Sequence, residues 1–221
     1  MIKLDRQQNL LLALAAKLKK PIKVYAVGGT AMMLWGFKDA TIDIDLVFES
    51  EKDRDDFRRA AEELGYKEAD SFKIYGAKPN QPVMLTLGDE RFDLFVNKVI
   101  DFVFSENMRR RATEKVYQYG NNLILHIANP HDIIVMKCAT DRLKDEDDAR
   151  RIIQTLTIDW NIVIDEAKNQ IRLGEERAIW DLGDFLTRLQ KTLKEKIPTK
   201  VLDQLLELLR IQIEEKQKRQ K

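Results

Sequence analysis

The chain has 221 residues, of which 44% are hydrophobic and 34% charged, so it can bury a core and its composition excludes an intrinsically disordered protein. Its 38 basic and 37 acidic residues leave a net charge of +1, which provides no global attraction to nucleic acid or to membranes. The single cysteine, Cys138, excludes an intrachain disulfide, and the two histidines are too few for a Cys/His zinc site. Without a secretory signal or an apolar run of about 20 residues, we expect a cytoplasmic protein without a membrane span.

The first 130 residues alternate between helical and strand-like patterns. Glycine, proline and asparagine turns separate the segments, and Ser50 is a suitable helix N-cap. In chain order, the patterns predict a helix over 4–18, a strand over 22–27, a short helix over 30–35, a strand over 42–48, a helix over 50–64, strands over 72–75, 83–87 and 91–96, and a hairpin of 116–119 with 123–127. This mixture indicates an α/β domain over residues 1–129.

After Pro130 the pattern becomes helical almost to the end of the chain. The predicted helices span 132–141, 144–156, 159–173, 175–194 and 199–217. We therefore expect a second, helical domain over residues 130–221.

Large apolar side chains occupy several positions in the predicted helices. The three tryptophans, Trp35, Trp160 and Trp180, are expected to pack in a core or between helices. The last helix also carries an apolar stripe, made of Leu202, Leu205, Leu206, Leu209 and Ile213. This stripe would pack either on the body of the protein or on a second subunit, and the sequence leaves the oligomeric state open.

Two acids lie two residues apart on one predicted strand. Side chains alternate between the faces of a strand, so the carboxylates of Asp43 and Asp45 point the same way, while Ile42, Ile44 and Leu46 point into a core. Adjacent carboxylates repel each other unless a cation lies between them. Magnesium is commonly held by one or two carboxylates together with substrate phosphates. The Asp-Ile-Asp segment is therefore a candidate site for Mg²⁺ or Mn²⁺.

A third acid, Asp93, lies on a later predicted strand among large apolar residues. If that strand neighbours the strand of Asp43 and Asp45, the three carboxylates converge and could hold two metal ions, which would activate an attacking hydroxyl and stabilise a leaving pyrophosphate. An amphipathic strand with acids on its solvent face would carry the same residues, so both interpretations stay open here. Asp89 and Asp101 are alternative third acids.

Gly28 and Gly29 connect a predicted strand to a predicted helix. Glycine permits a sharp turn and lets a ligand approach main-chain N–H groups, and a helix N-terminus attracts phosphate. An ordinary strand-to-helix turn would also use glycine. The combination with Thr30 and with the Thr-x-Asp-x-Asp segment that begins at Thr41 is more specific, and it favours a triphosphate site.

These motifs resemble the signature of polymerase-β-like nucleotidyltransferases, in which the glycine motif binds triphosphate, an Asp-x-Asp pair binds metal and a third acid completes the site. The matching segments are Val27-Gly28-Gly29-Thr30-Ala31 and Thr41-Ile42-Asp43-Ile44-Asp45-Leu46. Many members have Gly-Ser where this chain has Gly-Gly. The resemblance implies an α+β fold, with a mixed-sheet nucleotidyltransferase domain followed by a C-terminal helical bundle. It implies these site residues: the metal ligands Asp43, Asp45 and Asp93, and the nucleotide contacts Gly28, Gly29, Thr30 and Thr41.

The resemblance continues into the helical half. The segments Asn129-Pro130-His131-Asp132 to Lys137 and Asp141-Arg142-Leu143-Lys144-Asp145 to Asp148 are similar to the AbiEii-like and MenT-like branch, which includes toxins of toxin–antitoxin pairs. In that branch the lysine is implied to contact nucleotide phosphate, and an acid of the last motif is implied to assist catalysis. Those roles would fall on Lys137 and on Asp145 or Asp148.

The spacing of these residues can also be interpreted without the family. On one continuous helix, Lys137, Asp141, Asp145 and Asp148 would share a single face. Lys137 follows an apolar run, so its stem is expected to be buried and its ammonium group to require a partner. A solvated face of paired surface charges is the alternative, and it stays open for Asp145 and Asp148.

We therefore expect transfer of a nucleoside monophosphate from a nucleoside triphosphate to a hydroxyl of RNA or tRNA, of a protein or of a small molecule. A catalytically silent nucleotide-binding protein of the same fold is the alternative, as is a regulatory half of a toxin–antitoxin pair. In the toxin interpretation a cognate antitoxin would be a partner. A metal-dependent phosphohydrolase is disfavoured, because such sites usually add histidines and only His126 and His131 are present.

One concentrated basic run, Arg109-Arg110-Arg111 followed by Lys115, could meet the phosphates of a nucleic-acid acceptor. No aromatic side chains interleave with it as a base-stacking platform would require. A solvated loop or short helix is the preferred interpretation.

Overall fold

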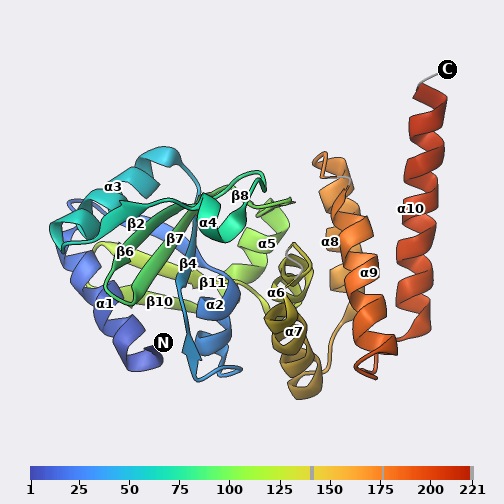
Figure 1. Ribbon diagram of the computed structural model, residues 1–221, viewed down its shortest axis with the longest axis horizontal. Helices are drawn as coiled ribbons and strands as arrows, with labels where there is room; N and C mark the ends of the chain where they lie inside the picture. The colour runs from blue at the N-terminus through green and yellow to red at the C-terminus, as the bar shows by residue number, and fades with distance from the viewer. Residues whose placement is uncertain (140–141, 176, 220–221) are drawn as a thin grey trace. The chain divides into compact units, whose positions relative to one another are not determined.

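The computed structural model describes residues 1–139, 142–175 and 177–219, and it shows an α+β protein made of two compact units. The first unit comprises Met1–Ile100 and Phe104–Pro130, and the second comprises Asp101–Val103 and His131–Lys221. Figure 1 shows strands and helices together in the first part of the chain and helices alone in the last part. Both units contain buried apolar side chains.

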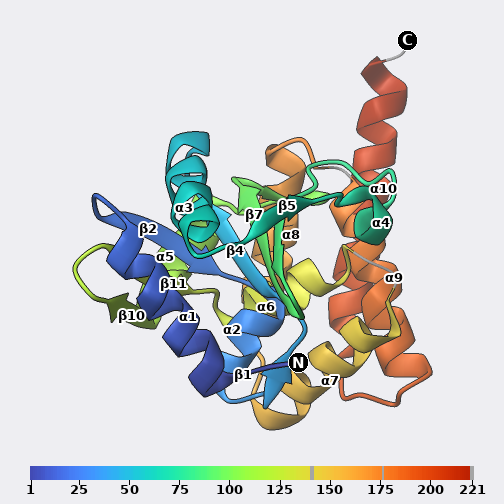
Figure 2. The same cartoon turned by 60° about the vertical axis from the view of Figure 1, so that its left-hand side comes forward.

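A seven-stranded mixed sheet forms the centre of the first unit (Figures 1 and 2). Its strands, in spatial order, are β10 (Val116–Tyr119), β11 (Leu123–Ile127), β2 (Ile22–Ala26), β4 (Ile44–Phe48), β7 (Glu90–Val96), β6 (Val83–Leu87) and β5 (Lys67–Ala69). The pairs β11/β2 and β4/β7 are parallel, and the other neighbouring pairs are antiparallel. The strands that carry the predicted acids, β4 and β7, are therefore direct neighbours.

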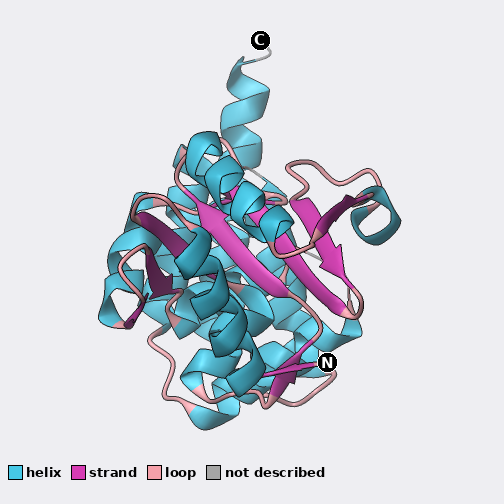
Figure 3. Ribbon diagram, turned by 90° about the vertical axis from the view of Figure 1, so that its left-hand side faces the viewer, coloured by secondary structure: helices cyan, strands magenta, loops and turns pink. Residues whose placement is uncertain are grey.

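Helices α1 (Leu4–Lys17) and α3 (Glu51–Glu63) lie side by side across one face of this sheet (Figure 3). Phe57 of α3 meets the rings of Phe48 on β4 and Phe92 on β7, at centroid distances of 5.3 and 5.8 Å. The even-numbered side chains of both strands thus fill the core beneath α3, and the odd-numbered ones point to the opposite face. As predicted, the Ser50 hydroxyl caps α3 by accepting a hydrogen bond from the Asp53 amide at 3.1 Å.

Short elements complete the first unit. They are β1 (Ile2–Lys3), α2 (Gly28–Trp35), β3 (Ala40–Thr41), α4 (Phe72–Tyr75), β8 (Lys98–Val99), α5 (Glu106–Arg111) and a 3₁₀ turn (Ala112–Glu114). Strand β9 (Phe102–Val103) spans two residues that belong to the second unit. Strands β1 and β3 pair with each other, which holds the chain just before the first predicted acids.

The structure contradicts the predicted strand over 72–75, because those residues form the helix α4. The amides of Tyr75 and Gly76 donate to the carbonyls of Ser71 and Phe72 at 2.9 and 2.8 Å, which is one helical turn. Four residues are too few for apolar periodicity to distinguish helix from strand. Strand β5 was not predicted, because its Lys-Glu-Ala sequence at the sheet edge has no apolar alternation.

The second unit is helical. Its helices are α6 (Pro130–Lys137), which starts at the last residue of the first unit, α7 (Leu143–Thr155), α8 (Trp160–Arg172), α9 (Arg177–Lys191) and α10 (Thr199–Arg219). Figure 1 shows α8, α9 and α10 packed side by side. The two separate helices predicted over 132–141 and 144–156 correspond to α6 and α7, so Lys137 does not share one continuous helix with Asp145 and Asp148; Asp141 lies outside the described residues. No helix among the described residues is both long enough and apolar enough to cross a membrane.

The structure also corrects the prediction for one tryptophan. Trp35 is half-buried and donates from Nε1 to the Ala128 carbonyl at 2.9 Å, as expected for a packing residue. Trp180, on α9, is instead 59% exposed. Its place in the helical pattern could not show which face of α9 the neighbouring helices cover.

Candidate active site

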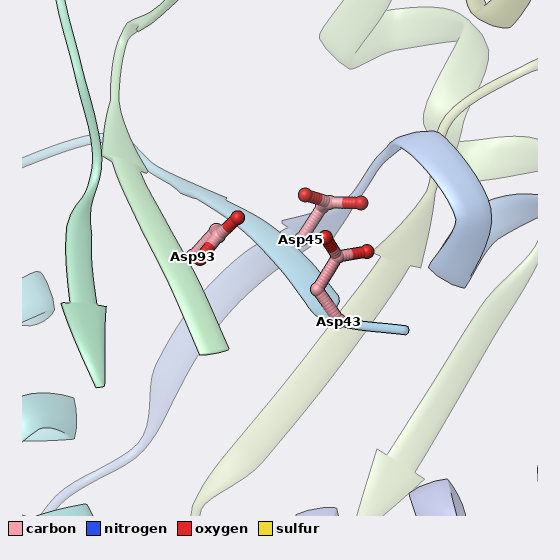
Figure 4. Close-up of side chains that lie close together, drawn as sticks. All are labelled: Asp43, Asp45 and Asp93. Carbon is pink, nitrogen blue, oxygen red and sulfur yellow. The ribbon is translucent and has the colours of Figure 1, made fainter. Parts of the chain in front are cut away.

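Three acids from neighbouring strands meet on one face of the sheet. Each of Asp43, Asp45 and Asp93 places a carboxylate oxygen within 4.8 Å of such an oxygen on the other two. Figure 4 shows the three side chains pointing toward one another, from β4, from the residue before β4 and from β7. The predicted convergence is therefore present in the structure, and the rival third acid Asp89 lies exposed outside it.

The register of β4 and β7 explains why two of these acids are neighbours. Asp45 is the direct cross-strand partner of Asp93, so both side chains leave the same face of the parallel pair. The flanking residues Ile44, Leu46 and Phe92 point to the other face and are fully buried. The burial of that apolar set fixes the register, because a slip by one residue would exchange the two faces.

Asp43 reaches the cluster from outside the strand. The chain bends at residues 42–43, between β3 and β4, and the regular pleat starts only at Ile44. The prediction that Ile42 points into the core is therefore wrong, since its side chain is 50% exposed. Thr41 helps to place Asp43 by donating its hydroxyl to Oδ1 at 3.4 Å.

Asp93 is the most enclosed of the three acids. It is fully buried, and its Oδ2 accepts a hydrogen bond from the Tyr75 hydroxyl at 2.6 Å. Burial raises the pKa of Asp93 to about 6; Arg91 and Tyr75 oppose this rise, while the nearby Asp43 carboxylate adds to it. Burial also raises the pKa of Tyr75, together with the charges of Asp45 and Asp93, so this hydroxyl stays protonated and acts as a donor.

Arg91 supplies a positive charge inside the cluster. Its guanidinium hydrogen-bonds Asp43 through Nη2, and its Nε lies 3.0 Å from Asp93 Oδ1. The second contact has ion-pair distance without hydrogen-bond alignment, so Asp93 Oδ1 is buried with no hydrogen-bond donor. Burial alone would lower the pKa of Arg91, but the Asp93 and Asp43 carboxylates outweigh it and raise the pKa.

The sequence-based site did not include Arg91 or Tyr75. Strand alternation offered a signal for Arg91, because it lies two residues before Asp93 and must share its face. Tyr75 offered no such signal, since its contact with Asp93 depends on the helix α4, where a strand was predicted.

The two glycines lie directly against the acids. Gly28 has a φ of +55°, and a Cβ on it would come within 2.5 Å of Asp45 Oδ2. A Cβ on Gly29 would collide with the Thr41 hydroxyl. Glycine is therefore required here both for backbone conformation and for space. The corner is held to β4 by the Val27 amide, which donates to the Asp45 carbonyl at 3.1 Å.

Thr30 ties the first turn of α2 to the start of β4. Its hydroxyl accepts a hydrogen bond from the Asp45 amide at 2.8 Å and donates to the Asp43 carbonyl at 3.4 Å. No side chain caps the N-terminus of α2, and its first turn contains no acid. The positive end of this helix is therefore directed to the same corner as the carboxylates, an arrangement suited to an anion held next to a cation.

The donor set fits a hard divalent cation. All three residues offer carboxylate oxygens, which Mg²⁺ and Mn²⁺ prefer. One oxygen, Asp93 Oδ1, is buried without a hydrogen-bond donor, and an unsatisfied buried acceptor is costly unless another partner takes it up. The triad is thus positioned to bind metal.

Three further predicted residues form a separate cluster in the second unit. The Lys137 ammonium donates to Asp145 Oδ1 at 2.7 Å and to Asp148 Oδ2 at 2.6 Å, and all three residues are buried. Burial alone would lower the pKa of Lys137, but the two carboxylates raise it. Arg142, at 2.9 Å from Asp145 Oδ2, adds a second cation. The solvated-face interpretation of Lys137, Asp145 and Asp148 is therefore wrong, although their catalytic and phosphate-binding roles stay predictions.

The basic run forms the helix α5, which agrees with the preferred interpretation of a short helix. Arg109 donates to the Asn97 side chain at 2.6 Å, and Lys115 donates to the Leu34 carbonyl at 2.6 Å. The ammonium of Lys115 also lies 4.6 Å from the ring centroid of Trp35. These two cations are engaged with protein groups.

A mixed sheet with converging acids beside a glycine corner is the arrangement that the resemblance to nucleotidyltransferases predicted. The chain belongs to a family described as "Nucleotidyltransferase of unknown function (DUF6036)", whose model matches residues 1–195. The protein is therefore a nucleotidyltransferase. The narrower resemblance to the AbiEii-like and MenT-like branch stays a prediction.

Two solved structures of ANT(2'')-Ia are similar to the chain. One, a crystal structure in complex with adenylyl-2''-tobramycin, is 17% identical with a TM-score of 0.44, and the match covers 82% of this chain and 98% of that chain. The other, a solution structure, is 16% identical with a TM-score of 0.44, covering 86% of this chain and 96% of that chain. No curated protein sequence matches the chain.

The glycine corner can be tested with a matched pair of substitutions. Gly28→Ala and Gly36→Ala both place a side chain at positive φ, where each should cost about 1 kcal/mol of stability. Only the Cβ at position 28 meets Asp45, whereas that at position 36 meets nothing within 4 Å. We therefore expect calorimetric Mg²⁺ binding to be lost in Gly28→Ala and retained in Gly36→Ala. Equal binding by both variants would contradict the role of the corner in placing Asp45.

The raised pKa of Asp93 predicts a pH-dependent stability of the metal-free protein. The folded state binds the Asp93 proton more tightly than the unfolded state, so the free energy of unfolding should fall as the pH rises from about 4 to about 6. At about 1.4 kcal/mol per pKa unit, this fall is at most about 3 kcal/mol. Urea titrations in chelator across this range should show a flatter pH dependence for Asp93→Asn. An unchanged slope in the variant would assign the effect to other groups.

Proposed function

We propose that the protein transfers a nucleoside monophosphate from a nucleoside triphosphate to an acceptor hydroxyl, with Asp43, Asp45 and Asp93 holding Mg²⁺ or Mn²⁺. The observation that carries this proposal is the meeting of three carboxylates within 4.8 Å beside the uncapped N-terminus of α2. The family supports nucleotidyl transfer in general. The metal dependence and the site residues are our own inference from the geometry.

In the proposed reaction, an oxygen of the acceptor attacks the α-phosphorus. A new P–O bond forms, the bond between the α-phosphorus and the bridging oxygen to the β-phosphate breaks, and pyrophosphate leaves with the electron pair. The acceptor hydroxyl loses its proton, which passes to water in the overall balance. When bound, the metal would lower the charge of the phosphates and of the attacking oxygen.

The protein groups contribute position and charge. The amides at the start of α2, with Gly28 and Gly29, would receive the triphosphate, because no side chain caps this helix end and its first turn contains no acid. Thr30 and Thr41 keep this turn and the acids in register through their hydroxyl contacts. Tyr75 would hold Asp93 in one orientation by hydrogen bonding to Oδ2, leaving Oδ1 directed to the cation.

Lys137, Asp145 and Asp148 enter the proposal through the resemblance alone. It assigns phosphate contact to Lys137 and catalytic assistance to one of the two acids. The Lys137→Met variant tests whether Lys137 is needed to stabilise the two acids in the folded protein, because it leaves two buried carboxylates without their shared cation. The activity assay must identify the acceptor class, which is RNA or tRNA, a protein or a small molecule. A toxin role with a cognate antitoxin also stays a prediction.

The activity assay should follow both products of the transfer. The full-length protein is incubated with each of the four α-³²P-labelled triphosphates, Mg²⁺ or Mn²⁺, and separate acceptor pools of total RNA, protein and small polyhydroxyl compounds. We expect release of pyrophosphate and a labelled acceptor in one pool. Asp43→Asn and Asp45→Asn should each lower the rate by at least about 100-fold, the scale of losing electrostatic stabilisation of the transition state.

Asp89→Asn is the matched control, because Asp89 is an exposed acid at the turn between β6 and the site strand β7. Its activity should equal that of the wild type. Binding of triphosphate without pyrophosphate release in any pool would favour the catalytically silent protein instead. Wild-type activity in Asp43→Asn and Asp45→Asn would overturn the proposed mechanism.

Substitution of Arg91 tests whether the acids bind a metal ion, and this test does not require enzyme turnover. Arg91 already neutralises part of the negative charge of Asp43 and Asp93, so a bound cation must share these oxygens with it. Arg91→Gln should therefore destabilise the chelator-treated protein and show a larger increase in melting temperature on addition of Mg²⁺. Thermal unfolding with and without metal measures both effects, with Arg58→Gln on α3 as a surface control. A smaller Mg²⁺ response in Arg91→Gln would contradict binding of metal to these acids.

A further inference from the structure

The last helix of the second unit has two apolar seams, and one of them is buried more completely against neighbouring helices than the other. Val201 and Leu205 are buried and Leu208 is half-buried, so this inner seam faces α8 and α9. The next residue at this helical spacing is Gln212, which is also buried. A second, outer seam follows one residue later along the helix, and its members are Leu202, Leu206, Leu209 and Ile213.

The outer seam has the spacing of a coiled-coil interface. Its members are separated by four, three and four residues, which is the heptad pattern that places one stripe against a partner helix. Leu206 is 49% exposed and Ile213 is 47% exposed, and Trp180 on the adjacent α9 is more exposed still. Large apolar side chains that repeat in this way and remain in water mark an interaction surface.

The surface beside this seam is hollowed. A depression of about 390 Å³ lies between α9 and α10, and its lining includes Trp180, Gly183, Leu206 and Leu209. A second depression of about 350 Å³ shares Leu209 and continues to Gln212 and Ile213. We call this pair of depressions the α9/α10 groove. It runs along the outer seam, so a partner helix would have both a ridge to contact and a groove to enter.

Gly183 has no intramolecular explanation. It lies inside the helix α9, its backbone shows no positive φ, and a Cβ on it would meet nothing within 4 Å. Glycine weakens a helix relative to alanine, and this monomer has room for the better residue. A glycine that lines a groove lets a partner side chain approach the helix backbone closely.

Gln212, where the inner seam ends, also lines the second depression. Its side chain is buried beside the second depression, and its Oε1 has no hydrogen-bond donor among the described residues. Buried acceptors are nearly always paired in folded proteins.

The charges flanking the outer seam indicate what the partner is. Asp203 and Arg210 are one heptad apart and flank the seam on the same side. If a second α10 lies antiparallel to the first, Asp203 of each helix faces Arg210 of the other, and the arrangement is identical for both copies. A twofold interface has this self-complementary character.

We propose that the outer seam and the α9/α10 groove form a homodimer interface, in which α10 of a second copy of this chain packs antiparallel against α10 of the first. Leu206 and Ile213 of each copy enter the groove of the other, over Gly183. The proposal concerns only the second unit, and it does not depend on the proposed transferase mechanism.

The oligomeric state of the full-length chain tests this directly. Light scattering coupled to size exclusion, over a dilution series, should show a dimer for the wild type and a monomer for Leu206→Glu. Gly183→Gln is the sharper variant, because its side chain fills the groove while removing a helix-weakening glycine. We expect it to lose dimerisation while the melting temperature measured at monomeric concentrations does not fall. A wild type that is monomeric at every concentration, or a Gly183→Gln protein that dimerises as tightly, would overturn the proposal.

Charge reversal tests the antiparallel arrangement. Asp203→Arg and Arg210→Asp should each weaken dimerisation by at least about tenfold, because like charges then face each other across the interface. The double variant should recover wild-type dimerisation, since the pairs are restored with their signs exchanged. Gln204→Lys, at an exposed position on the side of α10 opposite the outer seam, serves as the control and should leave the dimer unchanged. Failure of the double variant to recover would contradict the antiparallel pairing.

Discussion

Mutual repulsion of three carboxylates, two of them buried, is the constraint on which the first unit depends. Asp93 is completely buried and its neighbours lie within 4.8 Å, so the folded protein must supply compensating groups. Arg91 and Tyr75 do so from within, by ion pairing and by hydrogen bonding. Their compensation is incomplete, because the pKa of Asp93 remains raised and one of its oxygens has no donor. A divalent cation completes this balance in the proposed function.

The scaffold imposes this arrangement through its core rather than through the acids themselves. Packing of Phe57 against Phe48 and Phe92 fixes which faces of β4 and β7 are buried. The register then places Asp45 beside Asp93 on the opposite face, whatever the electrostatic cost. Such local conflict between charge and burial is expected at functional sites, where stability is exchanged for a prepared arrangement of ligands. The adjacent glycines belong to the same arrangement, because any side chain at position 28 would displace Asp45.

The second unit resolves a similar charge problem differently. Lys137 lies between Asp145 and Asp148, and Arg142 adds a second cation, so these buried charges are matched within the chain. The sequence predicted that Lys137 would be buried and would require a partner, and it placed the two acids on the same face as Lys137 only if the helix were continuous. The residues that approach one another instead belong to α6 and to α7, separated by a break in the helix.

The sequence by itself determined the features that depend on local periodicity. These are the main strands and helices, the N-cap at Ser50, the alternation of core and site faces along the strand of Asp45, and the family motifs that name the chemistry. The tertiary structure decided which strands are neighbours, and hence that Asp93 rather than Asp89 completes the triad. It also brought Tyr75 into the site and left Trp180 in water. The reason is physical: periodicity reports which side chains share a face of one element, whereas contacts between elements depend on how distant segments pack together.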